Sequence, residues 1–309
     1  MRLYLPTIVI ALPLLLQGQA PAMSAQKSVS RQESKQDADT QQTKKPPTKK
    51  TAKPEKPTWP RLKFSKKSTA KDKINLLVSG KPDVQAKART KILSYGAGVA
   101  PVLLAAYHDR QKQGILDQLE PLLDQLITKE YGPVLEISTN PKNLVQTKFT
   151  LAKLDSFEDA RYQSWFRKMT QVKDPEISDR AWYALARIGD AQALDFLIEK
   201  ARKDWNKEKD LILPVLPGLK GDGATDKLLT LLAKKELADK LAALRLLNGV
   251  GTKKCQGKVA EYLNSGVNVL RVEAVNALLG IVDGKKPHDH LSVFESIEVV
   301  KKWKSRMGV

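Results

Sequence analysis

The sequence of 309 residues has few of the residue types that build catalytic and metal sites. It contains one cysteine, Cys255, and three histidines, His108, His288 and His290. A single cysteine excludes a disulfide framework and a cysteine-based zinc or iron–sulfur site within the chain. Aromatic residues make up only 6%. This low share argues against an all-β sandwich or barrel, because strands favour aromatic side chains.

The sequence also lacks the motifs of common enzyme classes. It has no phosphate-binding loop, dinucleotide-binding glycine string, nucleophile elbow or zinc-protease motif. Two lysines beside Cys255 could lower its pKa, but no histidine or acid accompanies it in GTKKCQGK, so we interpret it as a small helix residue. His108 is expected at a helix C-terminus, where the helix dipole favours a cation.

His288 and His290 flank Asp289, and such a triplet can bind a divalent metal. The triplet lies in a predicted loop without another candidate ligand, and Asp289 is better explained as the cap of a helix that starts at Leu291. We therefore expect no catalytic, cofactor or metal site, and no small-molecule substrate. The predicted class is a protein that is not an enzyme.

The first residues are typical of an export signal. Met1-Arg2 gives a positive start, the stretch 3–16 is almost entirely apolar, and Ala20 and Ala22 form a small-residue cleavage pair. The apolar run has about 14 residues, where a spanning helix needs roughly 20. We expect residues 1–22 to be a cleaved signal peptide and the protein to be secreted, periplasmic or in the cell envelope.

Residues 23–71 are predicted to be a disordered linker rich in lysine, proline, threonine and glutamine. Between residues 26 and 71 there are 14 basic and 4 acidic side chains. Their net charge, 14 − 4 = +10, is more than half of the +19 of the whole chain. Apolar residues are too sparse there to offset the entropy of ordering the chain. Trp59 and Phe64 are its only aromatics, and we expect them to pack onto the start of the folded part.

Residues 72–309 contain an internal repeat. The windows PDVQAKARTKILSYG (82–96) and PEISDRAWYALARIG (175–189) align without gaps, and a third copy, NVLRVEAVNALLGIV, spans 268–282. A looser copy runs from Asp239 to Gly251. Equivalent positions 84, 177, 239 and 270 are separated by multiples of 31 residues. A fixed period of this size is typical of stacked helical repeats and predicts further copies near 115, 146 and 208.

Each repeat is predicted to hold two helices. The first begins after a Pro, Asp or Asn signal and ends near glycine. Second helices are expected at 99–107, 191–203, 224–234, 253–264 and 291–305. No convincing alternating strand pattern is present. The sequence therefore predicts an all-α fold of about seven helix pairs.

The repeated string, an aliphatic residue followed by a cation, alanine, leucine and a closing glycine, resembles the HEAT family. The resemblance is closest to the short HEAT-like repeats of phycobilisome lyases, and it covers roughly residues 72–309. It implies a right-handed α-solenoid whose second helices line the concave face and commonly bind macromolecules. Deoxyhypusine hydroxylases also resemble this fold but need paired His–Glu motifs, and none of the three histidines is followed by Glu.

The main functional hypothesis is an exported, non-enzymatic protein–protein interaction scaffold. One alternative is a protein that binds a polyanion, namely a cell-wall polymer, nucleic acid or membrane surface, through its lysine-rich linker, and another is an accessory subunit of an enzyme complex. Four lysines are expected to face outward from the second helices and to form a positive ridge for an acidic partner: Lys203, Lys227, Lys234 and Lys258.

Two further expectations concern charged and aromatic side chains. Arg180 and Arg271 are expected to pair with acids on adjacent repeats, such as Asp179 or Glu273. Trp205 lies between repeats and is expected to be the most exposed aromatic residue.

Overall fold

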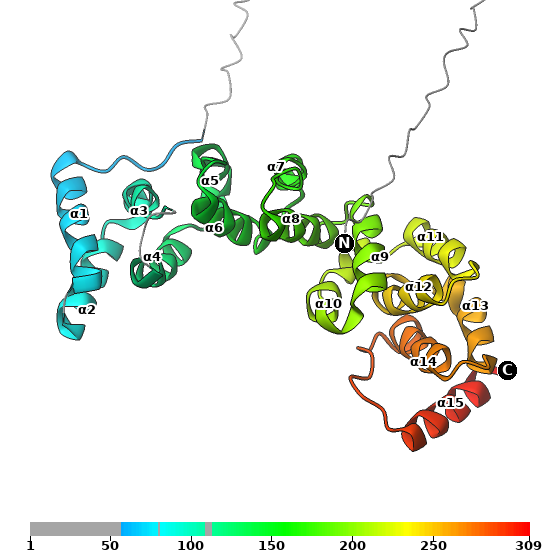
Figure 1. Ribbon diagram of the computed structural model, residues 1–309. Helices are drawn as coiled ribbons and strands as arrows, with labels where there is room; N and C mark the ends of the chain where they lie inside the picture. Colours follow the sequence, from blue (N-terminus) through cyan, green and yellow to red (C-terminus); the bar gives the residue numbers. More distant parts are fainter. Residues whose placement is uncertain (1–56, 80, 109–112) are drawn as a thin grey trace, which may run out of the picture. The chain divides into compact units, whose positions relative to one another are not determined.

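The computed structural model describes residues 57–79, 81–108 and 113–309 (Figure 1). The expected signal peptide and most of the expected linker lie outside these residues. The α-helices are α1 (Phe64–Ser79), α2 (Pro82–Leu93), α3 (Ala100–Ala106), α4 (Gln113–Leu126), α5 (Gly132–Ser138), α6 (Leu144–Asp155), α7 (Gln163–Met169), α8 (Pro175–Arg187), α9 (Ala193–Lys203), α10 (Trp205–Ile212), α11 (Asp222–Leu232), α12 (Leu237–Val250), α13 (Gln256–Ala260), α14 (Asn268–Asp283) and α15 (Val293–Met307). Short 3-10 helices include η4 (Leu216–Leu219) and η5 (Lys253–Cys255).

The part of the chain that the structure describes contains helices and no strand, which confirms the all-α prediction. The first helices α2, α4, α6, α8, α10, α12 and α14 begin at residues 82, 113, 144, 175, 205, 237 and 268, at intervals of 30 to 32 residues. Each is followed by one second helix, from α3 to α15. The predicted period of 31 residues and the seven helix pairs are therefore present within residues 81–108 and 113–309.

Three of the first helices, α6, α8 and α10, begin after a residue whose side chain caps the helix. The Asn143 side chain accepts a hydrogen bond from the Gln146 backbone N–H at the start of α6, and Asp174 does the same for Ile177 at the start of α8. Such caps satisfy backbone donors that have no partner within the helix. Gly189 follows α8 with a φ of +85°, a left-handed conformation that glycine adopts without steric cost.

Neighbouring repeats in the C-terminal half pack closely through glycine. A Cβ on Gly218 of η4 would overlap the Arg187 carbonyl at the end of α8, and one on Gly280 of α14 would overlap the Asn248 carbonyl of α12. Helices α12 and α14 contact each other directly, and η4 contacts both α8 and α12. Small residues at these points let neighbouring repeats approach backbone to backbone, so that leucine and alanine side chains form one continuous core.

The folded part begins earlier than the sequence indicated. Helix α1 starts at Phe64, inside the stretch 23–71 that was expected to be linker, and it packs against α2, α3 and α4. Its contacts come from apolar side chains at helical spacing: Ala70, Ile74 and Leu77 are all buried. Lysines surround these few apolar residues, so composition averaged over the window concealed the helix.

Candidate functional site

The second helices α9, α11 and α13 leave two grooves between them. The groove between α9 and α11 has a volume of about 430 Å³, with Ile198 and Leu231 among its apolar residues. The groove between α11 and α13 has a volume of about 580 Å³ and includes Leu229 and Tyr262. Thr230 of α11 lines both. Three successive repeats therefore present adjoining grooves, each with apolar and charged side chains; we call this surface the second-helix face.

The four lysines chosen from the sequence have different surroundings. Lys227 and Lys234 line the α9/α11 groove, and Lys258 lines the α11/α13 groove. Lys203 is exposed at the end of α9 and lines neither. The structure thus brings together three of the four residues along adjoining grooves and leaves the fourth outside them.

The three groove lysines of the expected positive ridge each lie beside an acidic side chain. The Lys227 Nζ lies 2.6 Å from the Asp195 carboxylate, and the Lys258 Nζ lies 2.9 Å from Glu261. Lys234 lies 3.7 Å from Asp239. Exposed ion pairs of this kind contribute little to stability, but each places a negative charge beside the positive one. The rims of the grooves are therefore mixed in charge.

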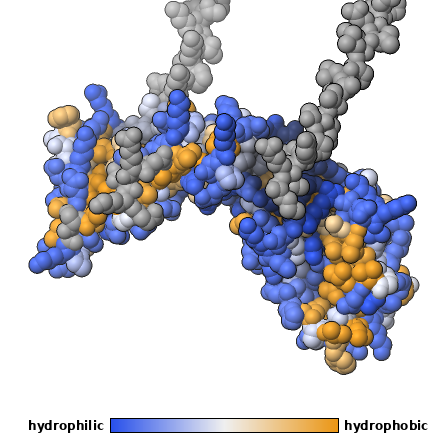
Figure 2. All heavy atoms as spheres, viewed as in Figure 1, coloured by the Kyte–Doolittle hydropathy of each residue, from blue (hydrophilic) through white to orange (hydrophobic). Residues whose placement is uncertain are grey.

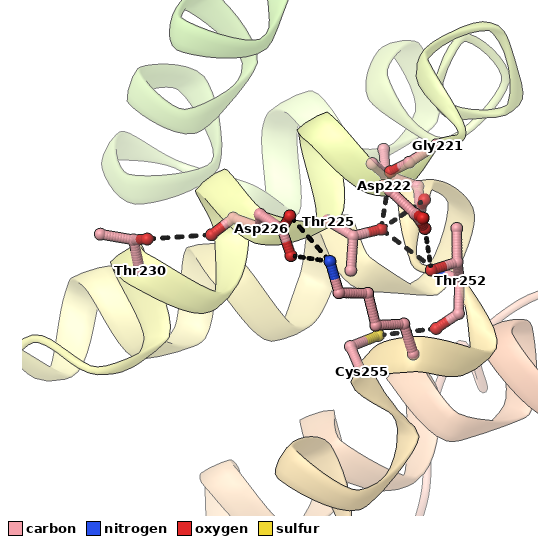
Figure 3. A network of polar contacts seen from close by, with 9 residues as sticks. Gly221, Asp222, Thr225, Asp226, Thr230, Thr252 and Cys255 are labelled. Carbon is pink, nitrogen blue, oxygen red and sulfur yellow. Dashed lines mark hydrogen bonds and ion pairs between the residues drawn. The ribbon is translucent and has the colours of Figure 1, made fainter.

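A network of polar contacts holds α11 to the start of the next second helix (Figure 3). The Thr225 hydroxyl donates to the Gly221 carbonyl at 2.7 Å and accepts from the Thr252 backbone N–H at 3.2 Å. The Thr252 hydroxyl donates to Asp222 at 2.8 Å, and Lys254 pairs with Asp226 at 2.9 Å. The network holds η5, which leads into α13, against α11.

Cys255 ends this network and is buried. Its Sγ donates to the Thr252 carbonyl at 3.0 Å, and burial raises the pKa of the thiol. The neighbouring lysines do not lower that pKa, because the sulfur points into the core whereas Lys254 extends to Asp226 (Figure 3). A buried thiol with a raised pKa is a poor nucleophile.

A segment of this chain already occupies the equivalent surface of the first two repeats. Residues 57–63 are non-helical and run past α3 to α5 (Figure 1). The Trp59 indole stacks on Tyr131 with ring centroids 5.6 Å apart, and its N–H donates to the Ser138 hydroxyl of α5 at 3.1 Å. Trp59 also lines cavities with Pro101 and Ala105 of α3.

Close backbone contact accompanies this seating. Leu62 is buried, and the Pro60 carbonyl lies so near Gly98 that a Cβ there would be 2.8 Å from its oxygen. The expectation that Trp59 packs onto the folded part therefore holds. Phe64 differs: it is 87% exposed.

The loop that contains His288, Asp289 and His290 lies against a separate polar cluster. The His288 backbone N–H donates to the Asn276 side chain at 3.0 Å. Asp289 lies 3.8 Å from Lys209 and does not cap the last helix as expected. Ser292 caps α15 instead, and Glu295 completes its capping box. The helix begins at Val293, two residues later than the predicted start at Leu291, so its cap also lies further along the chain.

Arg245 is the centre of this polar cluster. Its Nε donates to Glu273 at 2.9 Å, and its guanidinium lies 5.3 Å from the centre of the Trp205 ring. Trp205 is consequently half-buried, contrary to expectation. Across the described ranges, no group of three or more His, Cys, Asp or Glu side chains is arranged to hold a metal ion.

Pairing between repeats uses different arginines from those expected. Arg245 of α12, and not Arg271, binds Glu273, while Arg271 donates to the Ser265 carbonyl and to Asn268. Arg187 of α8 binds Asp155 of α6 at 2.9 Å. The sequence carried a signal that was missed: opposite charges 28 to 32 residues apart recur at the repeat spacing. Pairs of this kind are Arg187 with Asp155, Lys227 with Asp195, Lys254 with Asp226 and Arg245 with Glu273.

No family model matches the chain, and no curated protein is significantly similar to it. Among solved structures, human deoxyhypusine hydroxylase in complex with glycerol matches with a TM-score of 0.32 and 13% identity, over 79% of this chain and 97% of that chain. The recurrence of helix pairs every 30 to 32 residues in the described ranges identifies the fold without this match. The chain is a helical-repeat protein.

The same comparison corrects one expectation from the sequence. The chain was expected not to be an enzyme, whereas the matching solved structure is that of a hydroxylase. A TM-score of 0.32 transfers no activity to this helical-repeat protein. The expectation that the chain is not an enzyme is accordingly not retained. Within the residues described, no helix is long and apolar enough to cross a membrane.

Proposed function

We propose that this helical-repeat protein is a binding scaffold that takes extended polypeptide segments across its second-helix face. The seating of residues 57–63 on α3 and α5 is the observation that carries the proposal. There an extended segment places one large apolar side chain, Trp59, against two successive second helices and gives its indole N–H to a side chain of the second.

The grooves of α9, α11 and α13 offer the same elements without a segment of the described chain in them. Ile198 and Leu231 in one groove, and Leu229 and Tyr262 in the next, provide apolar contact for a side chain. Thr230 lies between the grooves, so a segment that uses both must pass over it. Binding modes of this kind combine apolar anchors with polar contacts that set the direction of the segment.

The paired charges at the rims of the grooves restrict which charges the partner can carry. An acidic segment must compete with Asp195 for Lys227 and with Glu261 for Lys258. A basic segment must in turn compete with Lys227 for Asp195 and with Lys258 for Glu261. Exchange of ion pairs is nearly neutral at exposed sites. The partner that fits is a segment with apolar anchors and charges of both signs, in place of the acidic partner expected from the lysines alone.

Two finer statements belong to the same proposal. The repeats are HEAT-like, supported by the repeated string at 82–96, 175–189 and 268–282, and their right-handed superhelix stays a prediction. Export is supported by the apolar run and the alanine pair of residues 1–22. Mass spectrometry of the N-terminus of the natural protein tests it, and an intact Met1 would count against cleavage.

The binding face is tested by blocking both grooves with one side chain. Thr230→Trp places an indole between the grooves, and Thr90→Trp on α2 is its matched control. Both threonines are exposed, and each donates its hydroxyl to the carbonyl four residues earlier, Asp226 for Thr230 and Ala86 for Thr90.

Peptides selected from a random display library on the full chain provide the probe. Their affinity should fall about tenfold or more in Thr230→Trp, which corresponds to about 1.4 kcal/mol, and stay unchanged in Thr90→Trp. Equal binding by both variants, with unchanged circular dichroism, would move the site away from this face.

A further inference from the structure

Helix α15 carries an exposed apolar face that the second-helix grooves do not use. Its inner side buries Val300 and Trp303. Its outer side exposes Val293 and Phe294 at 74% each and Ile297 at 54%. In Figure 2 orange residues gather around the beginning of this helix. Phe294 and Ile297 lie three residues apart and so share one side of the helix.

The charges along this face are divided between the two halves of the helix. Glu295 and Glu298 accompany the exposed apolar residues of the first half, and Lys301 and Lys302 follow in the second. Glu295 is engaged in the cap of α15. Among the residues that the structure describes, Glu298, Lys301 and Lys302 have no oppositely charged group within 4.0 Å. Lys302 lies near enough to Asp283 to help lower the pKa of that carboxyl, so Glu298 and Lys301 are the charges most available to a partner.

We infer that this face pairs with the same face of a second copy, with the two α15 helices antiparallel about a two-fold axis. Antiparallel pairing sets the acidic first half of one helix against the basic second half of the other. Phe294 and Ile297 of each copy then cover the apolar stem of Lys301 of its mate. A two-fold interface repeats every such contact, so one small face supplies two sets of contacts.

A lipid surface fits the same face less well. Anionic headgroups attract lysine but repel carboxylates, and Glu295 and Glu298 lie directly beside the apolar residues that would have to insert. A second copy, by contrast, places lysines opposite the carboxylates of this face and carboxylates opposite its lysines. Because two short helix faces bury less than a standard interface of about 1,600 Å², the pairing depends on concentration and is not permanent.

Sedimentation of the full chain from low micromolar to near-millimolar concentration is the first test. We expect a monomer–dimer equilibrium whose dissociation constant rises about tenfold or more in Ile297→Glu. Leu211→Glu on α10 is the control, because Leu211 is also 54% exposed. A wild-type chain that stays monomeric throughout, or a dimer that Ile297→Glu leaves intact, overturns the proposal.

A charge exchange tests the antiparallel arrangement. Glu298→Lys in one preparation, and Lys301→Glu with Lys302→Glu in another, should each weaken self-association, while an equal mixture should form a heterodimer. No recovery in the mixture overturns the antiparallel arrangement. Co-flotation of monomeric wild-type chain with phosphatidylserine vesicles, lost in Ile297→Glu, would instead assign the face to a lipid surface and overturn the self-pairing.

Discussion

The backbone carbonyl of Asn248 in α12 lies directly against Gly280 in α14, so that the two helices meet without a side chain between them. Asn248 secures the same crossing, since its side-chain amide donates to the Asn276 carbonyl at 2.6 Å. These contacts join the last two repeats, and α12 and α14 also form the polar cluster around Arg245.

Gly280→Ala should therefore be strongly destabilising. The new Cβ overlaps a backbone atom that a side-chain rotation cannot move, so the helices must separate, at a cost of about 1–3 kcal/mol or more. Gly223→Ala in α11 is the matched control, because nothing lies within 4 Å of its Cβ position. Alanine's higher helix propensity should leave that variant unchanged or more stable by up to about 1 kcal/mol. Urea unfolding measures both, and equal midpoints would contradict the close approach.

Trp59→Ala should release the segment 57–63 from the face of α3 and α5. The variant loses the stacking on Tyr131 and the hydrogen bond to Ser138, together about 1–3 kcal/mol of local stability. Tryptic cleavage after Arg61 and Lys63 should accelerate about tenfold, since local opening exposes both sites. Phe64→Ala, which removes an 87% exposed side chain, should cleave at the wild-type rate. Identical cleavage of the two variants would show that Trp59 does not hold the segment.

Asp190 should make stability depend on pH. Burial raises the pKa of its carboxyl, but hydrogen bonds from Arg167 at 2.8 Å, from the Gln192 backbone and from Gln163 outweigh burial and hold that pKa below its usual value. A lowered folded-state pKa contributes stability above the unfolded value of about 3.9, and this stability is lost as pH falls through the folded value.

The variant Asp190→Asn is accordingly expected to be about 1–3 kcal/mol less stable than wild type at pH 7. The gap should narrow below about pH 4. Asp289→Asn is the control, because its side chain is 95% exposed and 3.8 Å from Lys209, so the change should be small at every pH. Urea unfolding from pH 3 to 7 gives both curves. A stability difference between the two proteins that stays constant with pH would show that the charge of the Asp190 carboxylate does not stabilise the fold.

Cys255 should react slowly with thiol reagents in the folded protein. Its thiol is buried, donates to the Thr252 carbonyl and has a pKa raised by burial, so little thiolate is accessible at pH 8. Labelling by iodoacetamide should be at least about a hundredfold slower than in urea-unfolded chain, because it requires local opening. Thr252→Ala should accelerate it by loosening η5. Rapid labelling of the folded wild type would contradict the burial of the sulfur.

Period and helix positions could be predicted from the sequence because their causes are local. Copies anchored at 84, 177 and 270 lie in α2, α8 and α14, and the weaker copies near 115, 146 and 208 lie in α4, α6 and α10. Capping residues, closing glycines and apolar spacing act within one or two turns of helix, so a repeat that has them shows them directly in its sequence. For the same reason, four of the five predicted second helices begin and end within two residues of their predicted bounds, whereas the one expected at 253–264 is divided among η5, α13 and a further 3-10 helix (Glu261–Asn264).

Contacts between repeats were decided by the tertiary structure. Four outward lysines were identified correctly as surface residues, but only packing determined that Lys227 meets Asp195 and Lys258 meets Glu261. Likewise, only packing brought Trp59 to Tyr131 and Ser138, more than 70 residues away in the chain. The physical reason is that periodicity fixes which side of a helix faces the core, whereas the partner of each polar side chain depends on the distance and rotation between neighbouring helices.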